Sequence, residues 1–242
     1  MASQGGSIEE LRRFLEEQGL PVEASQAELL YRYGRMLKEA GESLNLSAIR
    51  EEKEIWRKHF LDSLLLFFAL DVPKGARVVD IGTGAGLPGL VVKIYRPDLS
   101  VTLVDSKHKK LAFVQRVLGE LGLQDVICKV ARAEELGQKE NWRASFDLAL
   151  VRAVAELRVL VEYGLPLLKL GGKLVAYKGP RAEEEVEEAR RALSLVGGEV
   201  EGIWRGRLPG VGEERKIVII RKTIPTSPAW PRRAGIPSKR PL

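Results

Sequence analysis

The stretch Val78–Gly89, VVDIGTGAGLPG, decides the fold, because a short apolar strand runs directly into a loop of small residues. Gly82, Gly84 and Gly86 permit positive φ angles and let a ligand approach the backbone closely. In open parallel sheets, ligands bind beyond the carboxyl ends of the strands, which is where such loops lie. The stretch therefore predicts a strand that leads into a ligand-binding loop.

Short apolar strands alternate with helical segments from about residue 76 onwards. We expect the strands in ARVVDIG, SVTLVDS, DVICKVA, FDLALVRA, GKLVAYKG, EVEGIWRG and RKIVIIR. One intervening helix is expected throughout ELRVLVEYGLPLLKLG, residues 156–171. This alternation is typical of an α/β fold with a mostly parallel sheet covered on both faces. The last two strands are joined by a loop too short for a helix, which predicts an antiparallel final strand.

The chain divides into three parts by pattern and composition. Residues 1–72 form a predicted helical appendage, in which Ser7 with Glu10 and Ser25 with Glu28 fit the capping box. A third helix of this part is expected from about residue 52 to residue 70. Residues 73–222 hold the α/β pattern. Residues 223–242 form a basic, proline-rich tail, which cannot pack a core and which we expect to run extended over the surface, in a semi-fixed path across the mouth of the site.

The composition excludes several classes of protein. Hydrophobic residues make up 45% and charged residues 30% of the 242 residues, which permits a soluble domain with a core. No apolar run approaches the roughly 20 residues of a membrane helix, and the N-terminus lacks a signal-peptide pattern. The single Cys128 cannot form an internal disulfide, and with His59 and His108 it is too few for a metal cluster. We therefore expect a cytoplasmic monomer with no membrane or metal partner.

The loop and Asp105, which ends the next strand, indicate a nucleoside-bearing cofactor, because a carboxylate there accepts hydrogen bonds from both ribose hydroxyls. Gly84, Gly86 and Gly89 also spell the dinucleotide fingerprint. Against a dinucleotide, Asp80 would repel a pyrophosphate, the Tyr-x-x-x-Lys pair of short-chain dehydrogenases is absent, and no second large domain remains. S-adenosylmethionine, which carries an ammonium group, would not be repelled. No Gly-Lys-Ser/Thr follows, which excludes a P-loop.

The pattern D-x-G-x-G-x-G, the acid that ends the second strand and the antiparallel final strand resemble the class I (Rossmann-like) methyltransferases. Ala133 and Glu134 would then flank the adenine, although Glu134 also fits a simple helix-start charge. Arg152 would contact the methionine carboxylate or the substrate. Together, the loop and the strand ends predict the following cofactor contacts: Asp80, Gly82, Gly84, Gly86, Asp105, Ala133, Glu134 and Arg152.

The residues after the fourth strand limit the chemistry. Arg152 to Ala155 stand where enzymes that methylate exocyclic amines carry Asn/Asp-Pro-Pro-aromatic, which disfavours that reaction. Methylation of cytosine C5 needs a nucleophilic cysteine, and Cys128 lies in an apolar strand. The N7 atom of guanine has a free lone pair and no proton to remove. Catalysis would then be placement of N7 in line with the methyl group, without a general base.

Four stretches resemble the family of bacterial 16S ribosomal RNA guanine-N7 methyltransferases, also called the glucose-inhibited division protein B family. They are NLSAI at residues 45–49, HFLDSL at 59–64, DIGTGAGLPGLVVKI at 80–94 and PRRAGIPSKRPL at 231–242. The resemblance implies S-adenosylmethionine as donor, a guanosine of 16S ribosomal RNA as acceptor, and naked RNA or a small-subunit particle as partner. The cofactor contacts that it implies are Gly82, Leu87, Asp105, Ser106, Lys107, Ala133, Glu134 and Arg152.

Polar residues of the appendage and the tail complete the predicted site. We expect the guanine to be oriented by a wall that consists of Asn45, His59, Asp62 and Arg152. The alternative for the three residues of the appendage is a polar cluster that braces it against the sheet. Phosphate neutralisation by Lys and Arg makes the basic tail a candidate RNA arm, with a solubilising tail as the alternative. The predicted RNA contacts are Ser63, Lys178, Arg232, Arg233, Lys239 and Arg240.

Two other classes of function stay open at this point. One is an RNA-binding protein that keeps an inactive cofactor fold, and the other is a dinucleotide oxidoreductase. Binding of S-adenosylmethionine without binding of NAD would separate them from a methyltransferase. We also expect that deleting residues 229–242 reduces RNA methylation while cofactor binding persists.

Overall fold

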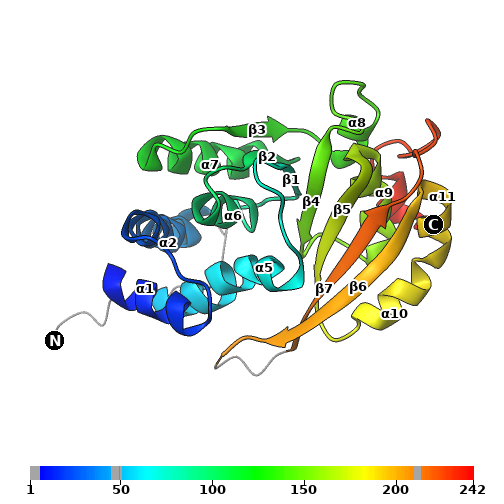
Figure 1. Cartoon of the computed structure of the whole chain (residues 1–242). Coiled ribbons are helices and arrows are strands. Elements are labelled where there is room, and N and C mark those ends of the chain that lie inside the picture. The colour runs from blue at the N-terminus through cyan, green and yellow to red at the C-terminus, as the bar shows by residue number, and fades with distance from the viewer. Residues whose placement is uncertain (1–5, 45–48, 50, 210–213) are drawn as a thin grey trace.

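A seven-stranded sheet forms the centre of the protein in the computed structural model, which describes residues 6–44, 49, 51–209 and 214–242 (Figure 1). The strand order is β3-β2-β1-β4-β5-β7-β6. The strands are β1 (Arg77–Ile81), β2 (Ser100–Asp105), β3 (Val126–Val130), β4 (Phe146–Arg152), β5 (Leu168–Lys178), β6 (Gly198–Arg207) and β7 (Glu214–Lys222). Six of the seven strands therefore arise within about one residue of the predicted bounds, whereas β5 begins four residues before the expected GKLVAYKG.

The pairing directions confirm the mostly parallel sheet. β1 pairs in parallel with both β2 and β4, so the strand order reverses beside β1. β7 is antiparallel to β5 on one side and to β6 on the other, which confirms the antiparallel final strand. The reversal beside β1 creates a crevice at the carboxyl ends of the strands, where ligands bind in folds of this kind.

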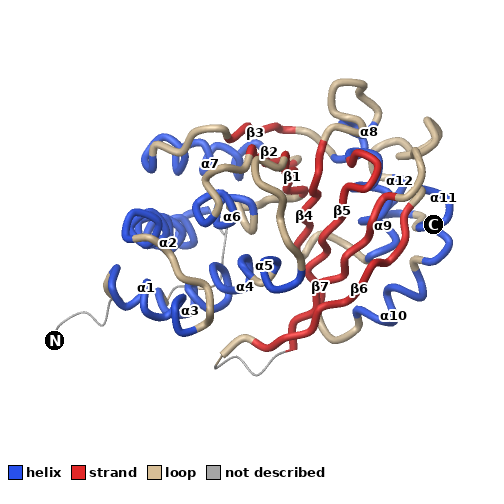
Figure 2. Tube along the Cα trace, viewed as in Figure 1, coloured by secondary structure: helices blue, strands red, loops and turns tan. Residues whose placement is uncertain are grey.

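Helices cover both faces of the sheet (Figures 1 and 2). One face carries α1 (Ile8–Glu17), α2 (Ala24–Leu44), α3 (Glu52–Ile55), η1 (Trp56–Leu61), α4 (Asp62–Leu64), α5 (Leu66–Ala69), α6 (Gly89–Tyr95) and α7 (His108–Leu121). The other carries α8 (Ala133–Gly137), α9 (Leu157–Gly164), η2 (Leu165–Leu167), α10 (Ala182–Glu188), α11 (Arg190–Val196) and α12 (Ile236–Lys239). Among the described residues, no helix is both long enough and apolar enough to cross a bilayer.

The apolar residues form one core on each face, because successive strand residues point to opposite sides. Val78 of β1 lies in the first core, and its neighbour Val79 lies in the second. Leu11 and Leu30 of the N-terminal helices are fully buried in the first core together with Leu90 of α6. The N-terminal part therefore shares its core with the sheet and packs on the first face together with α6 and α7.

The N-terminal helices differ in detail from the expected boundaries. The capping box of Ser7 and Glu10 is present, whereas α2 begins at Ala24 and places Ser25 inside the helix. The third helix runs nearly as predicted, but residues Trp56–Leu61 form a π-helical turn. Such wider turns are frequent at functional sites, and this one contains His59.

Two predictions about later elements are wrong. The helix expected over residues 156–171 ends at Gly164, because Pro166 allows only a 3-10 turn before β5 begins at Leu168. The tail was expected to run extended over the surface, yet Pro231 and Pro237 are buried and α12 forms within it. Proline loses little conformational entropy on packing, and the tail's carbonyl groups find partners on the sheet domain, as described below.

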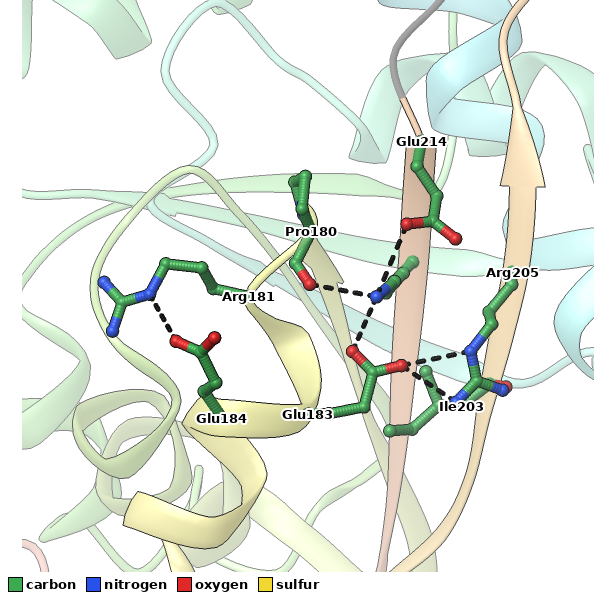
Figure 3. A network of polar contacts seen from close by, with 8 residues as sticks. Pro180, Arg181, Glu183, Glu184, Ile203, Arg205 and Glu214 are labelled. Carbon is green, nitrogen blue, oxygen red and sulfur yellow. Dashed lines mark hydrogen bonds and ion pairs between the residues drawn. The ribbon is translucent and has the colours of Figure 1, made fainter.

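Polar contacts hold α10 against the β6–β7 hairpin (Figure 3). The carboxylate of Glu183 accepts hydrogen bonds from Lys216 at 2.6 Å and from Arg205 at 2.8 and 3.0 Å. The Lys216 bond is the main reason why the pKa of Glu183 falls to about 2. This network fixes the start of α10 beside the carboxyl end of β5.

Candidate active site

Two adjoining hollows open at the carboxyl ends of the central strands. The first has a volume of about 310 Å³ and lies beyond β1, β2 and β3. The second has a volume of about 600 Å³ and lies beyond β4 and β5. Ala153 and Val154, which follow β4, line both hollows. A molecule in one hollow would therefore meet a molecule in the other at these two residues.

The first hollow brings together most of the predicted cofactor residues. Its lining includes Gly82, Asp105, Ser106, Lys107, Ala133 and Glu134. Leu87, Asp80, Gly84 and Gly86 are not part of this lining, and Arg152 lines the second hollow. The structure thus assembles two groups: residues that face the hollow, and residues of the glycine loop that shape it.

The glycine loop is shaped by close approaches that exclude a side chain. Gly82 has a φ of +71°, and a Cβ there would lie 2.6 Å from a methyl group of Val154. Gly86 has a φ of +98°, and a Cβ there would lie 2.6 Å from Leu90. Both conformations favour glycine. The loop is also tied to the N-terminal helices, because the Tyr33 hydroxyl donates to the carbonyl of Ala85 at 2.7 Å.

Asp80 acts inside this loop and is fully buried. Its Oδ2 atom accepts hydrogen bonds from the Thr83 hydroxyl at 2.6 Å and from the Gly89 amide at 2.9 Å. Its Oδ1 atom is buried and has no hydrogen-bond partner among the described residues. Burial raises the pKa of Asp80 to about 6. In this structure Asp80 joins the loop to α6, and its direct contact with a cofactor stays a prediction.

We expect Asp80 to make the protein less stable as the pH rises. The pKa in the folded state is about 6, above the usual value near 4, so between these values the folded state holds a proton that the unfolded state has lost. Relative to the non-titrating Asp80→Asn variant, the wild type should lose roughly 2 kcal/mol of unfolding free energy between pH 4 and pH 8. Urea unfolding of both proteins across this range measures the difference, and parallel pH profiles would refute the buried-carboxylate explanation.

Asp105 ends β2 at the floor of the first hollow. Its carboxylate accepts hydrogen bonds from the Gly84 amide at 3.0 Å and the Lys107 amide at 2.8 Å, and the residue is 6% exposed. Two backbone donors therefore fix the orientation of the carboxylate. A carboxylate oxygen accepts more than one hydrogen bond, so capacity remains for the two hydroxyls of a ribose.

Glu134 lies across the first hollow from the glycine loop. It belongs to the first turn of α8 and is 3% exposed. Its Oε1 atom accepts a hydrogen bond of 2.8 Å from the amide of Gly235, which belongs to the C-terminal tail. Glu134 thus carries the helix-start charge of the alternative interpretation and also borders the first hollow. The tail therefore reaches the edge of the first hollow.

The second hollow centres on a carboxylate between two guanidinium groups. Asp62 accepts from Arg152 at 2.9 Å and from Arg215 at 3.0 Å, and the Asp62 side chain is 9% exposed. His59 and Tyr177 also line this hollow. Burial, followed by the nearby charge of Arg152, lowers the pKa of His59 to about 4, so its imidazole is neutral at pH 7.

Comparisons with known proteins identify the family. A family model described as rRNA small subunit methyltransferase G (GidB) matches residues 26–211. The chain belongs to this family. A curated relative from Moorella thermoacetica named "Ribosomal RNA small subunit methyltransferase G" is 47% identical over 232 residues, which is 96% of this chain and 97% of the relative. A relative of the same name from Roseiflexus castenholzii is 45% identical over 97% of this chain and 100% of its own.

Solved structures show the same fold at low sequence identity. TrmN from Thermus thermophilus matches with a TM-score of 0.51 and 19% identity, over 69% of this chain and 53% of that one. A ribosomal protein L11 methylase from Lactobacillus delbrueckii subsp. bulgaricus gives a TM-score of 0.51 at 16% identity, over 69% and 79%. The predicted class I methyltransferase fold and the prediction of an S-adenosylmethionine-dependent methyltransferase are thereby confirmed.

The structure places the predicted RNA contacts of this methyltransferase in different settings. Arg233, Lys239 and Arg240 are exposed. Lys178 donates to Glu185 and to the Ala155 carbonyl, both at 2.7 Å, although it still lines the second hollow. The outcome is different for three other predicted residues, Ser63, Arg232 and Asn45.

The predicted direct contact of Ser63 with RNA is wrong, because this residue has no exposed surface and its hydroxyl donates to the His59 carbonyl at 2.6 Å. Arg232 is paired with the buried Glu162 at 2.6 Å, so its guanidinium is engaged within the protein. Asn45 lies outside the described residues. In the part of the chain that the structure describes, no group of three or more His, Cys, Asp or Glu side chains is placed to hold a metal ion.

Several residues that line the hollows escaped the sequence-based prediction. In the second hollow they are Lys58, Tyr177, Arg215 and Lys216; in the first they are Lys110, Arg132 and Tyr163. Most are basic, which suits a site that must receive a polyanion. Two of them, Tyr177 and Arg215, could have been found from the register and the direction of the predicted strands.

Proposed function

We propose that this protein transfers the methyl group of S-adenosylmethionine to N7 of a guanosine in 16S ribosomal RNA. The observation that carries the proposal is the pair of adjoining hollows, which meet at Ala153 and Val154. One hollow holds an oriented carboxylate suited to a ribose, and the other is lined by basic and polar side chains. The membership of the chain in a methyltransferase family supports the assignment.

The first hollow fits S-adenosylmethionine through its donor and acceptor groups. Asp105 would accept hydrogen bonds from the ribose hydroxyls. Gly82 has no side chain, so its backbone is open beside the cofactor, and a Cβ at this position would collide with Val154. Ala133 and Glu134 would border the adenine. When bound, the cofactor supplies an electrophilic methyl group on a sulfonium. The protein's task is then to hold that methyl group at the boundary with the second hollow.

The second hollow would hold the guanine. Asp62 offers a carboxylate and Arg152 a guanidinium, groups that pair with the donors and the O6 acceptor of guanine. His59 is neutral at pH 7 and adds no charge beside the ring. Because N7 carries its own lone pair, orientation is the main requirement, and good orientation is worth roughly 7–11 kcal/mol of barrier.

The RNA would approach over basic side chains at the rims of both hollows. Lys110 and Arg132 border the first hollow, and Lys58 and Arg215 border the second. Exposed Arg233, Lys239 and Arg240 extend this surface along the tail. Such residues neutralise phosphates and make binding dependent on salt. We propose further that the protein works as a cytoplasmic monomer on naked 16S RNA or on a small-subunit particle.

We expect methyl transfer to one guanosine when the protein meets RNA that lacks the modification. Small subunits and naked 16S RNA from a strain without this gene are incubated with labelled S-adenosylmethionine and the purified protein. Cleavage by borohydride and aniline, which attacks N7-methylguanosine, maps the product. Label on an exocyclic amine or a ring carbon, or binding of NAD instead of S-adenosylmethionine, would contradict the proposal.

A further inference from the structure

An arginine between β3 and β4, Arg143, fastens the start of the C-terminal tail to the sheet domain. Arg143 donates to the carbonyls of Thr226 at 2.6 Å, Ser227 at 2.9 Å and Trp230 at 2.8 Å. The same guanidinium donates to the carbonyl of Gly137 at the end of α8 at 2.7 Å. Arg143 thus joins the start of the tail to the helix that carries Glu134.

The C-terminal end of α8 provides the surface against which the tail packs. A Cβ at Gly137 would lie 2.8 Å from the ring of Pro231, so only glycine allows this approach. The side chain of Gln138 donates a hydrogen bond to the carbonyl of Pro231. The last turn of α8 therefore packs directly against the tail, while its first turn faces the first hollow.

A buried carboxylate requires the tail. Glu162 of α9 has no exposed surface, and it accepts from the Arg232 amide at 2.7 Å and from the Arg232 guanidinium at 2.6 and 2.9 Å. A buried charge is costly without its partner. The pairing therefore holds residue 232 in one place, three residues before Gly235.

Gly235 makes the contact that reaches the cofactor side. With a φ of +83° it directs its amide at Oε1 of Glu134, 2.8 Å away. Glu134 lines the first hollow. Its carboxylate is thus oriented from the hollow's outer side by the tail, just as Asp105 is oriented by backbone amides on the opposite side.

We infer that the tail supports the outer wall of the cofactor pocket by holding Glu134, and that Arg232 is a positioning residue, which acts through Gly235 on Glu134. This inference rests on the proposed function, since it assigns Glu134 to the adenine of S-adenosylmethionine. It replaces the expectation that deletion of residues 229–242 leaves cofactor binding intact. Arg233, Lys239 and Arg240 lie on the same segment, so RNA bound to them would alter cofactor affinity, and the cofactor would alter RNA affinity by the same factor.

The test is a cycle of four proteins that all carry Glu162→Gln. This substitution keeps a side-chain oxygen that can accept from Arg232 in the full chain, and it leaves no buried unpaired charge when the tail is removed. Two have the full chain and two end at Pro228; one of each pair also carries Glu134→Ala. Calorimetry gives the Kd of S-adenosylmethionine, and circular dichroism checks the fold. We expect Glu134→Ala to raise Kd at least tenfold in the full chain, truncation alone to raise it at least fivefold, and Glu134→Ala to add less than twofold after truncation.

The control keeps the wall and removes its exposed charges. A full chain with Arg233→Ala, Lys239→Ala and Arg240→Ala should bind S-adenosylmethionine within twofold of the wild type, while its RNA binding loses part of its salt dependence. If truncation leaves Kd unchanged, or if the losses from truncation and from Glu134→Ala multiply, the inference is overturned while the proposed function stands. If the full chain binds no S-adenosylmethionine, the proposed function itself fails.

Discussion

Replacing Asp105 with alanine should weaken S-adenosylmethionine binding at least about a hundredfold. Hydrogen bonds to a charged acceptor are worth roughly 1.5–3 kcal/mol each, and two ribose hydroxyls would lose their acceptor together. The substitution also releases the amides of Gly84 and Lys107, which Asp105 now holds at 3.0 and 2.8 Å. The glycine loop would therefore lose its anchor on β2 as well. Isothermal titration calorimetry measures the change directly.

Asp98 provides the matched control for this experiment. It also accepts from a backbone amide, that of Gly75, at 2.8 Å, but it precedes β2 at the opposite edge of the sheet. Asp98→Ala should therefore leave the Kd of S-adenosylmethionine within twofold of the wild type. Equal affinity in Asp105→Ala and in the wild type would remove the ribose contact from the proposal.

The sequence predicts the sheet and the first hollow because both depend on local patterns. Each strand is a short apolar run, and the glycine loop and Asp105 follow directly from where two of these runs end. Strand ends of a parallel sheet meet at one edge, so residues as distant as Gly82 and Ala133 could be placed together without a structure. The family resemblance added the cofactor contacts Leu87, Ser106 and Lys107, the polar residues of the appendage and the tail motif.

Tyr177 and Arg215 show what pairing register adds. Tyr177 stands opposite Arg152 in the β4–β5 ladder, so both side chains point to the same side of the sheet. The prediction chose Lys178, one residue further, which also lines the second hollow, and it missed Tyr177. Arg215 is the second residue of β7, and the start of an antiparallel strand returns to the edge where parallel strands end. That consequence of the predicted antiparallel strand was available from the sequence.

Long-range pairings of the tail could not be predicted. Nothing in the composition of residues 223–242 shows that Arg232 meets Glu162 or that Gly235 meets Glu134. Proline and basic residues are typical of solvated segments, and the average property of the segment conceals a few specific contacts. Ser63 is buried just after the π-helical turn, and the helical spacing of the sequence shows neither feature.

Asp62→Asn should reduce methyl transfer to RNA at least about a hundredfold while S-adenosylmethionine binds within threefold of the wild type. The carboxylate lies between Arg152 at 2.9 Å and Arg215 at 3.0 Å, and neither arginine would keep a charged partner at this position. Two guanidinium groups would then repel each other at the wall that faces the guanine. Breaking a buried ion pair costs roughly 3–5 kcal/mol. Because the Arg215 side chain is 25% exposed, we expect a cost near the lower end of this range. Single-turnover methylation with saturating cofactor measures the loss.

Glu183→Gln separates an effect on the site from a general loss of ion pairing. Glu183 also lies between two cations, Lys216 at 2.6 Å and Arg205 at 2.8 Å, but it stands outside both hollows (Figure 3). We expect this variant to methylate RNA within threefold of the wild type. If the Asp62 and Glu183 variants lose activity equally, the pairing around Asp62 only stabilises the protein. If Asp62→Asn alone loses activity and still binds the cofactor, the carboxylate between two arginines is what holds the guanine in line.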